Sequence, residues 1–292
     1  MQVRSYGPSL AVSSLGLGAG QVGDAALSEA QAEQLLNATL DLGITLIDTA
    51  RGYGLSEERI GRHLRHRRSE FVLSTKVGYG IPGLPDWTGE TITAGIDAAL
   101  QRLQTDVLDI VHLHSCDLAV LQRSDVVDAL LRARERGKLR VAAYSGENEA
   151  LAWAIASGHF GGIECSVNLF DQGSLVPLLE QAQQRGMGVI AKRPLGNAPW
   201  RFTERPVGDY AETYWERMQA LAIDRGGLPW DELALRFTLA QAPVSCAIAG
   251  TGSLAHLRHN VTLAARGPLP ADQALALRAR YVAVGAGWRG EV

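Results

Sequence analysis

Eight short, largely apolar segments, most of them followed by a longer amphipathic stretch, constrain the fold of this chain more than any other feature. Such segments are typical of strands in a parallel sheet that is buried on both faces. Eight of them within 292 residues predict a closed (β/α)8 TIM barrel that forms one domain over residues 1–292. The predicted strands are SLGLGAG (14–20), TLIDTA (45–50), FVLSTKVG (71–78), VLDIVHLH (107–114), RVAAYSGE (140–147), IECSVN (163–168), GVIAKRP (188–194) and SCAIAGT (245–251).

The segments between and before these strands fit the same architecture. Amphipathic patterns predict helices over Ser28–Leu42, Glu57–Arg67, Ile92–Leu103 and Asp125–Arg136. The polar N-terminal stretch 2–15, with Gly7-Pro8 near its centre, predicts a β-hairpin that closes the floor of the barrel. A longer excursion over roughly residues 196–231 predicts an insertion between barrel strands 7 and 8.

Composition and charge exclude several classes of function. The formal net charge of −3 leaves no basic surface for nucleic acid or for acidic lipids. No uncharged apolar run approaches the length of a membrane span, and the first residues lack the apolar core of a signal peptide. Three distant cysteines, Cys116, Cys165 and Cys246, show no zinc-binding spacing. We therefore expect a cytoplasmic protein without a metal and without a nucleic-acid or membrane partner; the sequence indicates no oligomeric state.

One motif favours a different fold. Gly18, Gly20 and Gly23 fit the G-x-G-x-x-G pattern of dinucleotide-binding Rossmann domains, and Asp41 follows about 20 residues later. In that motif a helix opens on the third glycine, whereas here the helical pattern begins only after Ser28. A doubly wound sheet also leaves the eight regular units unexplained, so the barrel is the better interpretation.

Four ionisable side chains follow the carboxyl ends of predicted strands, where barrels place their chemistry. They are Asp48, Tyr53, Lys76 and His114. A lysine ammonium stabilises a phenolate and shifts the phenol pKa toward the working pH, and a carboxylate keeps that buried lysine charged. A neutral histidine then orients a substrate oxygen. This set is suited to giving a proton to a carbonyl oxygen while a hydride reaches the carbon.

The chain resembles the aldo-keto reductase superfamily from end to end. The most specific segment is DTARGYGLSEERIGRHL (48–64), and the segments LSTKVG (73–78), ALQRLQTDVLDIVHLHS (99–115), GKLRVAAYSGEN (137–148) and NLFDQ (168–172) follow in the family's order. The resemblance implies that Tyr53 is the acid–base residue, that Lys76 and Asp48 tune it, and that His114 orients the carbonyl. His112 lies two residues deeper on the same face, and we interpret it as a structural layer of the barrel.

Hydride chemistry requires a nicotinamide, because no side chain supplies hydride. The resemblance implies NADPH, with NADH as an alternative, bound across the barrel mouth. The implied cofactor-binding residues are Gly18, Gly20, Gln21, Ser145, Glu164, Lys192, Arg193, Pro194, Leu195, Gly196, Gly250, Thr251, Gly252, His256 and Asn260.

Several of these positions depart from the family pattern. Glu164 stands where the family has a glutamine, and a carboxylate accepts a carboxamide N–H but cannot donate to the carboxamide oxygen. Lys192 replaces the aromatic residue that stacks on nicotinamide, and its cation is expected to favour the reduced, neutral ring. Gly250 and His256 replace basic residues around the 2′-phosphate, which weakens the expected preference for NADPH over NADH.

The leading hypothesis is an NAD(P)H-dependent reductase of aldehydes or ketones. Two alternatives stay open: a cofactor-binding regulatory or interaction subunit with little turnover, and an isomerase or lyase that uses Lys76 as a Schiff base. Tyr79, Trp87 and Trp200 are candidates for an apolar substrate pocket. The sequence does not identify the substrate beyond a small carbonyl compound.

Overall fold

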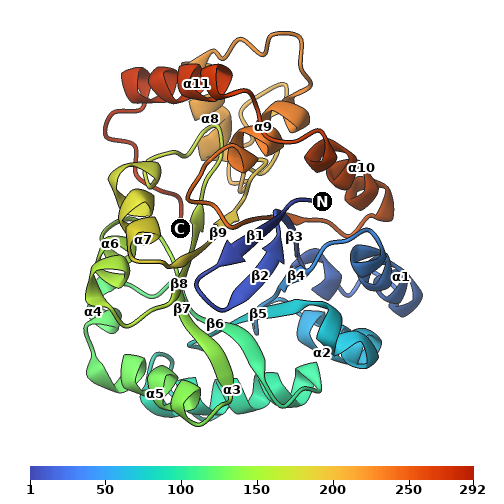
Figure 1. The fold of residues 1–292 in the computed structure, drawn as a ribbon, viewed down its shortest axis with the longest axis vertical. Coiled ribbons are helices and arrows are strands. Elements are labelled where there is room, and N and C mark those ends of the chain that lie inside the picture. The colour runs from blue at the N-terminus through green and yellow to red at the C-terminus, as the bar shows by residue number, and fades with distance from the viewer.

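The computed structural model describes residues 1–292 and contains the predicted closed barrel of eight parallel strands (Figure 1). Strand β10 pairs with both β9 and β3 and so closes the sheet. All eight predicted strands are confirmed. Their bounds are β3 (Leu15–Gly18), β4 (Leu46–Asp48), β5 (Val72–Val77), β6 (Leu108–His114), β7 (Leu139–Ser145), β8 (Gly162–Ser166), β9 (Gly188–Lys192) and β10 (Cys246–Gly250).

Helices surround the barrel and bury their apolar faces against it in a core cluster of 64 residues. Ser28 caps α1 through a reciprocal capping box with Gln31, which explains why that helix begins where the sequence predicts. The helices are α1 (Glu29–Asp41), α2 (Ser56–Leu64), α3 (Gly89–Leu103), α4 (Leu118–Leu121), α5 (Ser124–Glu135), α6 (Asn148–Ser157), α7 (Glu180–Gln184), α8 (Glu212–Leu221), α9 (Trp230–Leu239), α10 (Leu254–Ala265) and α11 (Ala271–Val284), with short helical turns η1 (Gln21–Gly23), η2 (Arg65–Glu70), η3 (Leu175–Leu179) and η4 (Pro199–Arg201).

The N-terminal hairpin closes the barrel floor, as predicted. Strands β1 (Val3–Tyr6) and β2 (Leu10–Ser13) pair antiparallel, and Tyr6 is fully buried in the floor. A side chain at Gly162 or Gly188 would lie 2.0 or 2.4 Å from the Tyr6 side chain, so glycine at the start of β8 and β9 makes room for the ring.

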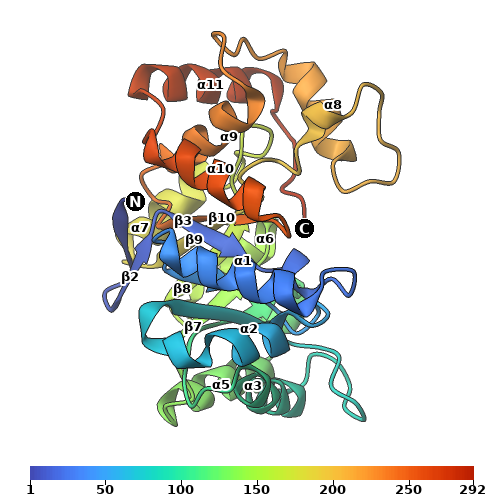
Figure 2. The same ribbon diagram turned by 90° about the vertical axis from the view of Figure 1, so that its right-hand side faces the viewer.

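The insertion and the C-terminus lie toward the other end. Between β9 and β10 the chain forms η4, α8 and α9, which confirms the predicted insertion. Figure 2 shows the hairpin and the C-terminus at opposite ends of the barrel.

The glycine motif after β3 leads into η1, and α1 starts only at Glu29, so the dinucleotide-binding alternative is wrong. None of the helices combines the length and apolar composition needed to cross a lipid bilayer.

Side chains that point into the barrel change from apolar to polar along β4, β5 and β6. Leu46, Val72 and Ile110 belong to an interior apolar cluster of 11 residues near the floor. Two residues further along the same strands come Asp48, Ser74 and His112, all of them buried. Because residues two apart share a face, this alternation builds a polar layer between the floor and the mouth.

Candidate active site

Four predicted catalytic side chains meet at the carboxyl ends of three adjacent strands. Asp48 ends β4, Lys76 lies near the end of β5, and His114 ends β6. Tyr53 lies on the loop between β4 and α2, and the centre of its ring is 5.9 Å from that of His114 in an edge-to-face arrangement. The barrel therefore assembles groups that are up to 66 residues apart in the sequence, from 48 to 114.

Lys76 is a buried cation. Its side chain is 1% exposed, and Nζ donates hydrogen bonds to the Asp48 carboxylate and, at 3.1 Å, to the Thr49 carbonyl oxygen. Burial lowers the pKa of Lys76, but the carboxylates of Asp48 and Glu164 outweigh burial and raise it above its usual value. An ammonium that keeps its proton does not attack a carbonyl carbon, which argues against the Schiff-base alternative.

Glu164 supplies a second carboxylate beside Lys76. Its Oε2 atom lies 3.4 Å from Lys76 Nζ and 3.8 Å from His112 Nε2, and it has no hydrogen-bond partner. Its Oε1 atom accepts a hydrogen bond of 3.4 Å from the Ser145 hydroxyl. Glu164 therefore faces Lys76 with one oxygen and Ser145 with the other, a position that the resemblance did not indicate.

Asp48, Lys76 and Glu164, here called the Lys76 cluster, hold two carboxyl groups around one ammonium. Burial and the Glu164 carboxylate raise the pKa of Asp48, and the hydrogen bonds from Lys76 and Ser74 only partly counter this. One carboxyl of the cluster consequently keeps its proton well above the pH at which a solvated aspartate loses it.

Tyr53 is held at the rim above this cluster. A side chain at Gly23 would lie 1.7 Å from the Tyr53 carbonyl oxygen, so the approach of the two loops requires glycine. Lys76 Nζ lies 5.3 Å from the centre of the phenol ring. The ammonium lowers the pKa of Tyr53, but burial and the carboxylates of Asp48 and Glu164 leave it above its usual value. The net shift is thus opposite to the predicted one, and the phenol stays protonated at neutral pH.

The two histidines of β6 lie at different levels. His112 is fully buried with Nε2 3.2 Å from the Ser74 hydroxyl, and burial lowers its pKa to about 4. His114 lies at the mouth, where Nδ1 is 2.8 Å from the Tyr79 hydroxyl. Burial and the Lys76 ammonium lower the pKa of His114 to about 3. Both imidazoles are therefore neutral at pH 7, and His114 is the one that reaches the mouth.

The loops after β3 and β10 form one wall of the mouth. Gly18 pairs with Gly250 between these strands, and a side chain at Gly250 would lie 2.6 Å from the Gln21 amide oxygen. A Cβ atom at Gly20 would lie 3.9 Å from the Tyr53 ring, an ordinary contact distance, so the loop after β3 borders the phenol.

The other predicted cofactor residues follow β9 and β10. Pro194, Leu195 and Gly196 come directly after Lys192 and Arg193, and Gly196 has a φ of +53°. Ser253 caps α10 by accepting a hydrogen bond from the His256 backbone N–H. Along this segment, Thr251 and Asn260 are buried, Gly252 is half-buried and the His256 side chain is exposed.

Lys192, at the end of β9, has a buried counter-ion. Its Nζ atom lies 3.3 Å from Oε1 of Glu147, whose side chain is 2% exposed. The same oxygen accepts a hydrogen bond of 2.7 Å from the Ser166 backbone N–H. Burial raises the pKa of Glu147 to about 7 although Lys192 opposes the shift. The Lys192 charge is therefore compensated above this pH, a feature that the sequence analysis missed.

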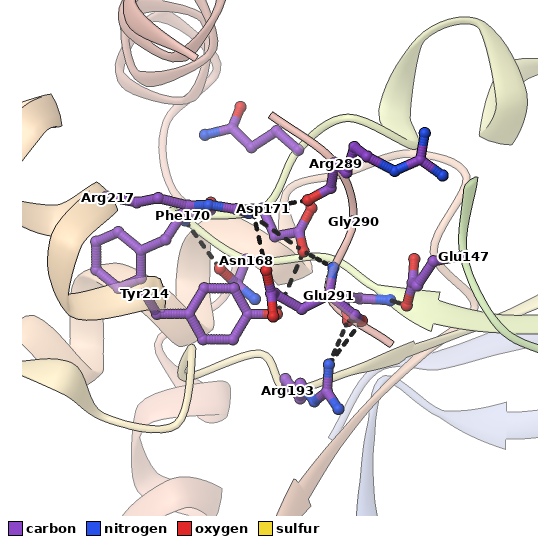
Figure 3. Close-up of polar contacts among 12 residues, drawn as sticks. Glu147, Asn168, Phe170, Asp171, Arg193, Tyr214, Arg217, Arg289, Gly290 and Glu291 are labelled. Carbon is purple, nitrogen blue, oxygen red and sulfur yellow. Dashed lines mark hydrogen bonds and ion pairs between the residues drawn. The ribbon is translucent and has the colours of Figure 1, made fainter. Parts of the chain in front are cut away.

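The C-terminal tail, residues 285–292, places Gly290 and Glu291 beside Glu147, Asp171 and Arg193, in the loops after β7, β8 and β9 (Figure 3). Arg193 donates hydrogen bonds to the carbonyl oxygens of Glu291 at 2.7 Å and Val292 at 3.1 Å. Asp171 accepts one of 3.0 Å from the Glu291 backbone N–H, and Arg217 donates one of 2.7 Å to the Arg289 backbone carbonyl oxygen. The guanidinium of Arg193, a residue predicted to bind the cofactor, thus holds the tail.

The candidate substrate residues separate into two groups. The rings of Tyr79 and Trp87 lie 6.0 Å apart, and Tyr79 stacks on His114 with centres 5.4 Å apart. Trp200 instead stacks on Trp230 at 6.0 Å within the insertion. Tyr79 and Trp87 therefore share the wall that carries His114, whereas Trp200 contributes to aromatic packing above β9.

Comparisons with known proteins agree over most of the chain. A sequence model of the Aldo/keto reductase family matches residues 14–281. L-galactose dehydrogenase of Arabidopsis thaliana is 27% identical over 279 residues, which cover 89% of this chain and 87% of that protein. D-threo-aldose 1-dehydrogenase of a Pseudomonas species is 28% identical over 300 residues, covering 88% and 90%. The solved holo form of aldo-keto reductase AKR11C1 from Bacillus halodurans matches with a TM-score of 0.81 at 27% identity, over 96% of each chain.

Proposed function

The chain belongs to the aldo/keto reductase family and is an oxidoreductase, and on this premise we propose that it reduces aldehydes or ketones to alcohols with NAD(P)H. The observation that carries the proposal is the buried Lys76 ammonium beneath a protonated Tyr53, with neutral His114 beside both. This arrangement supports proton donation to an oxygen at the mouth.

Each side chain has a distinct part in this reaction. Tyr53 donates a proton to the carbonyl oxygen as negative charge develops there, and the Lys76 ammonium stabilises the phenolate that remains. Asp48 keeps Lys76 charged and in place. His114 donates a hydrogen bond to the same carbonyl oxygen and fixes the orientation of the substrate. Bound nicotinamide would supply the hydride to the carbonyl carbon.

The residues present fit a nicotinamide nucleotide at the mouth. Gly20 borders the Tyr53 ring, and the Gln21 amide lies against Gly250, so the loops after β3 and β10 line the same side of the mouth. We propose NADPH as the preferred cofactor with NADH accepted, because His256 is the one basic side chain on the first turn of α10 and the family's other basic position is Gly250.

The direct test is oxidation of NADPH, followed at 340 nm, with a panel of aldehydes, ketones and aldoses, repeated with NADH. Aldoses belong in the panel because two relatives are named as dehydrogenases of L-galactose and of D-threo-aldoses. Turnover of at least one carbonyl compound is expected. Nucleotide binding without turnover of any compound, in either direction, contradicts the proposal and favours the regulatory-subunit alternative.

The rate of carbonyl reduction is expected to show no limb that arises from His114 or Tyr53 between about pH 5 and about pH 9. His114 gains a proton only near its lowered pKa of about 3, so the acid limb lies below this range. Tyr53 has a raised pKa and must be protonated to act, so the alkaline limb lies above it. A profile of kcat/KM against pH is compared with the pH titration of the His114 15N signal, because Asp48 and Glu147 have raised pKa values of their own. A His114 imidazole that gains its proton at pH 6 to 7 contradicts this account.

The Lys192–Glu147 pair is expected to make the preference for oxidised or reduced cofactor depend on pH. As the pH falls through about 7, Glu147 gains a proton and the Lys192 charge loses its compensation. The positively charged oxidised nicotinamide should then bind roughly 5–10-fold more weakly relative to the reduced form. Titrations with NADP+ and NADPH at pH 6 and pH 8 measure this ratio.

The variant Glu147→Gln tests the origin of that effect. This variant should bind NADP+ weakly at both pH values. Adding Lys192→Met should restore tight binding of NADP+, because the uncompensated charge is removed. A ratio that is the same at pH 6 and pH 8 in the unaltered protein contradicts this account of Lys192.

A further inference from the structure

The Tyr79 side chain is fixed against His114 by its surroundings. Its ring stacks on the imidazole with an interplanar angle of 27°. A Cβ atom at Gly52 would lie 2.8 Å from the Tyr79 hydroxyl, and one at Gly78 would lie 2.1 Å from the Trp87 ring. The absence of side chains at both glycines thus lets Tyr79 and Trp87 pack into this position.

The hydrogen bond between Tyr79 and His114 leaves one ring nitrogen free. The Tyr79 hydroxyl lies 2.8 Å from Nδ1, and this is its one hydrogen bond within the protein. Nε2 of His114 forms no hydrogen bond to any protein group, and the imidazole packs edge-to-face with the Tyr53 ring at the mouth. Nε2 is therefore free to form a hydrogen bond with a substrate, either through a hydrogen or through a lone pair.

A neutral imidazole has a single N–H, and its location depends on what the other nitrogen meets. The Tyr79 hydroxyl has no other acceptor within the protein, so donation to Nδ1 gives its hydrogen a partner inside the site. Nδ1 then accepts, and the imidazole hydrogen is on Nε2. The reverse arrangement places the Nε2 lone pair against the lone pairs of a carbonyl oxygen, which repel it.

We propose that Tyr79 is a positioning residue: its hydroxyl donates to Nδ1 of His114 and so holds the tautomer whose Nε2–H binds the substrate carbonyl oxygen. This inference rests on the proposed carbonyl reduction for its functional consequence. The tautomer itself is a property of this chain and is measured without cofactor or substrate.

The first experiment is a 15N spectrum of the unliganded protein labelled in its seven histidines, recorded at pH 8. The signal of His114 is identified by its absence from His114→Gln. A protonated Nε2 and an unprotonated Nδ1 are expected. A proton on Nδ1 means that Tyr79 accepts rather than donates, and it overturns the proposal.

The second experiment is a double-mutant cycle on carbonyl reduction. Tyr79→Phe keeps the stacked ring and removes the hydroxyl, so it should lower kcat roughly ten-fold with unchanged affinity for NADPH. In the background of His114→Gln, the same change should have no further effect. Equal losses in both backgrounds, or no loss in either, overturn the proposal. Tyr210→Phe, which removes a hydroxyl from a side chain that is 86% exposed, is the matched control and should leave kcat unchanged.

The two experiments separate this inference from the proposed function. If the unaltered protein reduces no carbonyl compound, the proposed function fails, and the 15N spectrum alone decides whether Tyr79 sets the tautomer. If reduction occurs but the spectrum shows a proton on Nδ1, the positioning role fails and the proposed function stands.

Discussion

Replacing Tyr53 by phenylalanine is expected to lower kcat for carbonyl reduction by about 10²–10⁴-fold, the usual contribution of a positioned general acid. The substitution removes the phenol proton and leaves the ring that packs edge-to-face with His114 and lies over the Lys76 ammonium. The Lys76 ammonium below the ring keeps its hydrogen bonds to Asp48 and Thr49. The loss should therefore be one of chemistry rather than of folding.

Three measurements distinguish these possibilities for Tyr53→Phe. Single-turnover reduction with saturating NADPH reports the chemical step, fluorescence titration reports cofactor affinity, and urea unfolding reports stability. We expect a slower chemical step, with cofactor affinity and stability unchanged. A variant that keeps more than about a tenth of the turnover contradicts proton donation by Tyr53.

The barrel and its polar rim are predictable from sequence because the pattern of each strand lies within a few consecutive residues. Apolar segments repeat eight times, and residues two apart share a face, so Leu46 and Asp48 must point the same way. The same rule separates His112 from His114 by one level within the barrel. Chemistry at the carboxyl ends then follows from the barrel itself.

Partnerships between side chains are less predictable, because they join strands that are distant in sequence. Glu164 and Lys76 are 88 residues apart, 164 against 76, and their contact depends on the curvature of the closed sheet. Glu147 pairs with Lys192 in the same way. Glu164 is the middle residue of β8, whereas Glu147 lies two residues beyond the end of β7. The alternation of side chains was therefore a usable signal for Glu164 once the barrel was assumed.

The direction of the Tyr53 pKa shift does not follow from the Lys76 ammonium alone. One ammonium lowers it, whereas burial and two carboxylates raise it, and the sum decides the direction. The sequence identifies Lys76 and Asp48 but not the distance or burial that weights each contribution. The tail offers still less information, since residues 285–292 have neither helical nor strand periodicity, and their position depends on hydrogen bonds from Arg193 and Arg217.

Replacing Lys76 by methionine is expected to lower the free energy of unfolding by about 3–5 kcal/mol at pH 8, because the substitution leaves two buried carboxyl groups without a counter-ion. Candidate ligand atoms of Asp48 and Glu164 lie within 4.8 Å of each other. Burial raises the pKa of each carboxyl, whereas Lys76 lowers it. Without the ammonium, both folded-state pKa values therefore rise above those of the unfolded chain, near 4.

The sign of the pH dependence follows from linkage. Between the unfolded and folded pKa values, the folded state binds more protons than the unfolded state, so stability falls as the pH rises. The penalty in Lys76→Met should accordingly be small near pH 5 and large at pH 8, as measured by urea unfolding at both pH values. A loss that is equal at the two pH values would indicate altered packing rather than unpaired charge.

The matched control carries Lys76→Met together with Asp48→Asn and Glu164→Gln. It removes the carboxylates along with the ammonium, so most of the stability lost at pH 8 should return and the pH dependence should flatten. Carbonyl reduction should stay impaired, because no cation remains to stabilise the Tyr53 phenolate. If the triple variant is stable but reduces carbonyl compounds slowly, the Lys76 charge serves the chemistry. Asp48 and Glu164 then serve to stabilise that charge in the barrel interior.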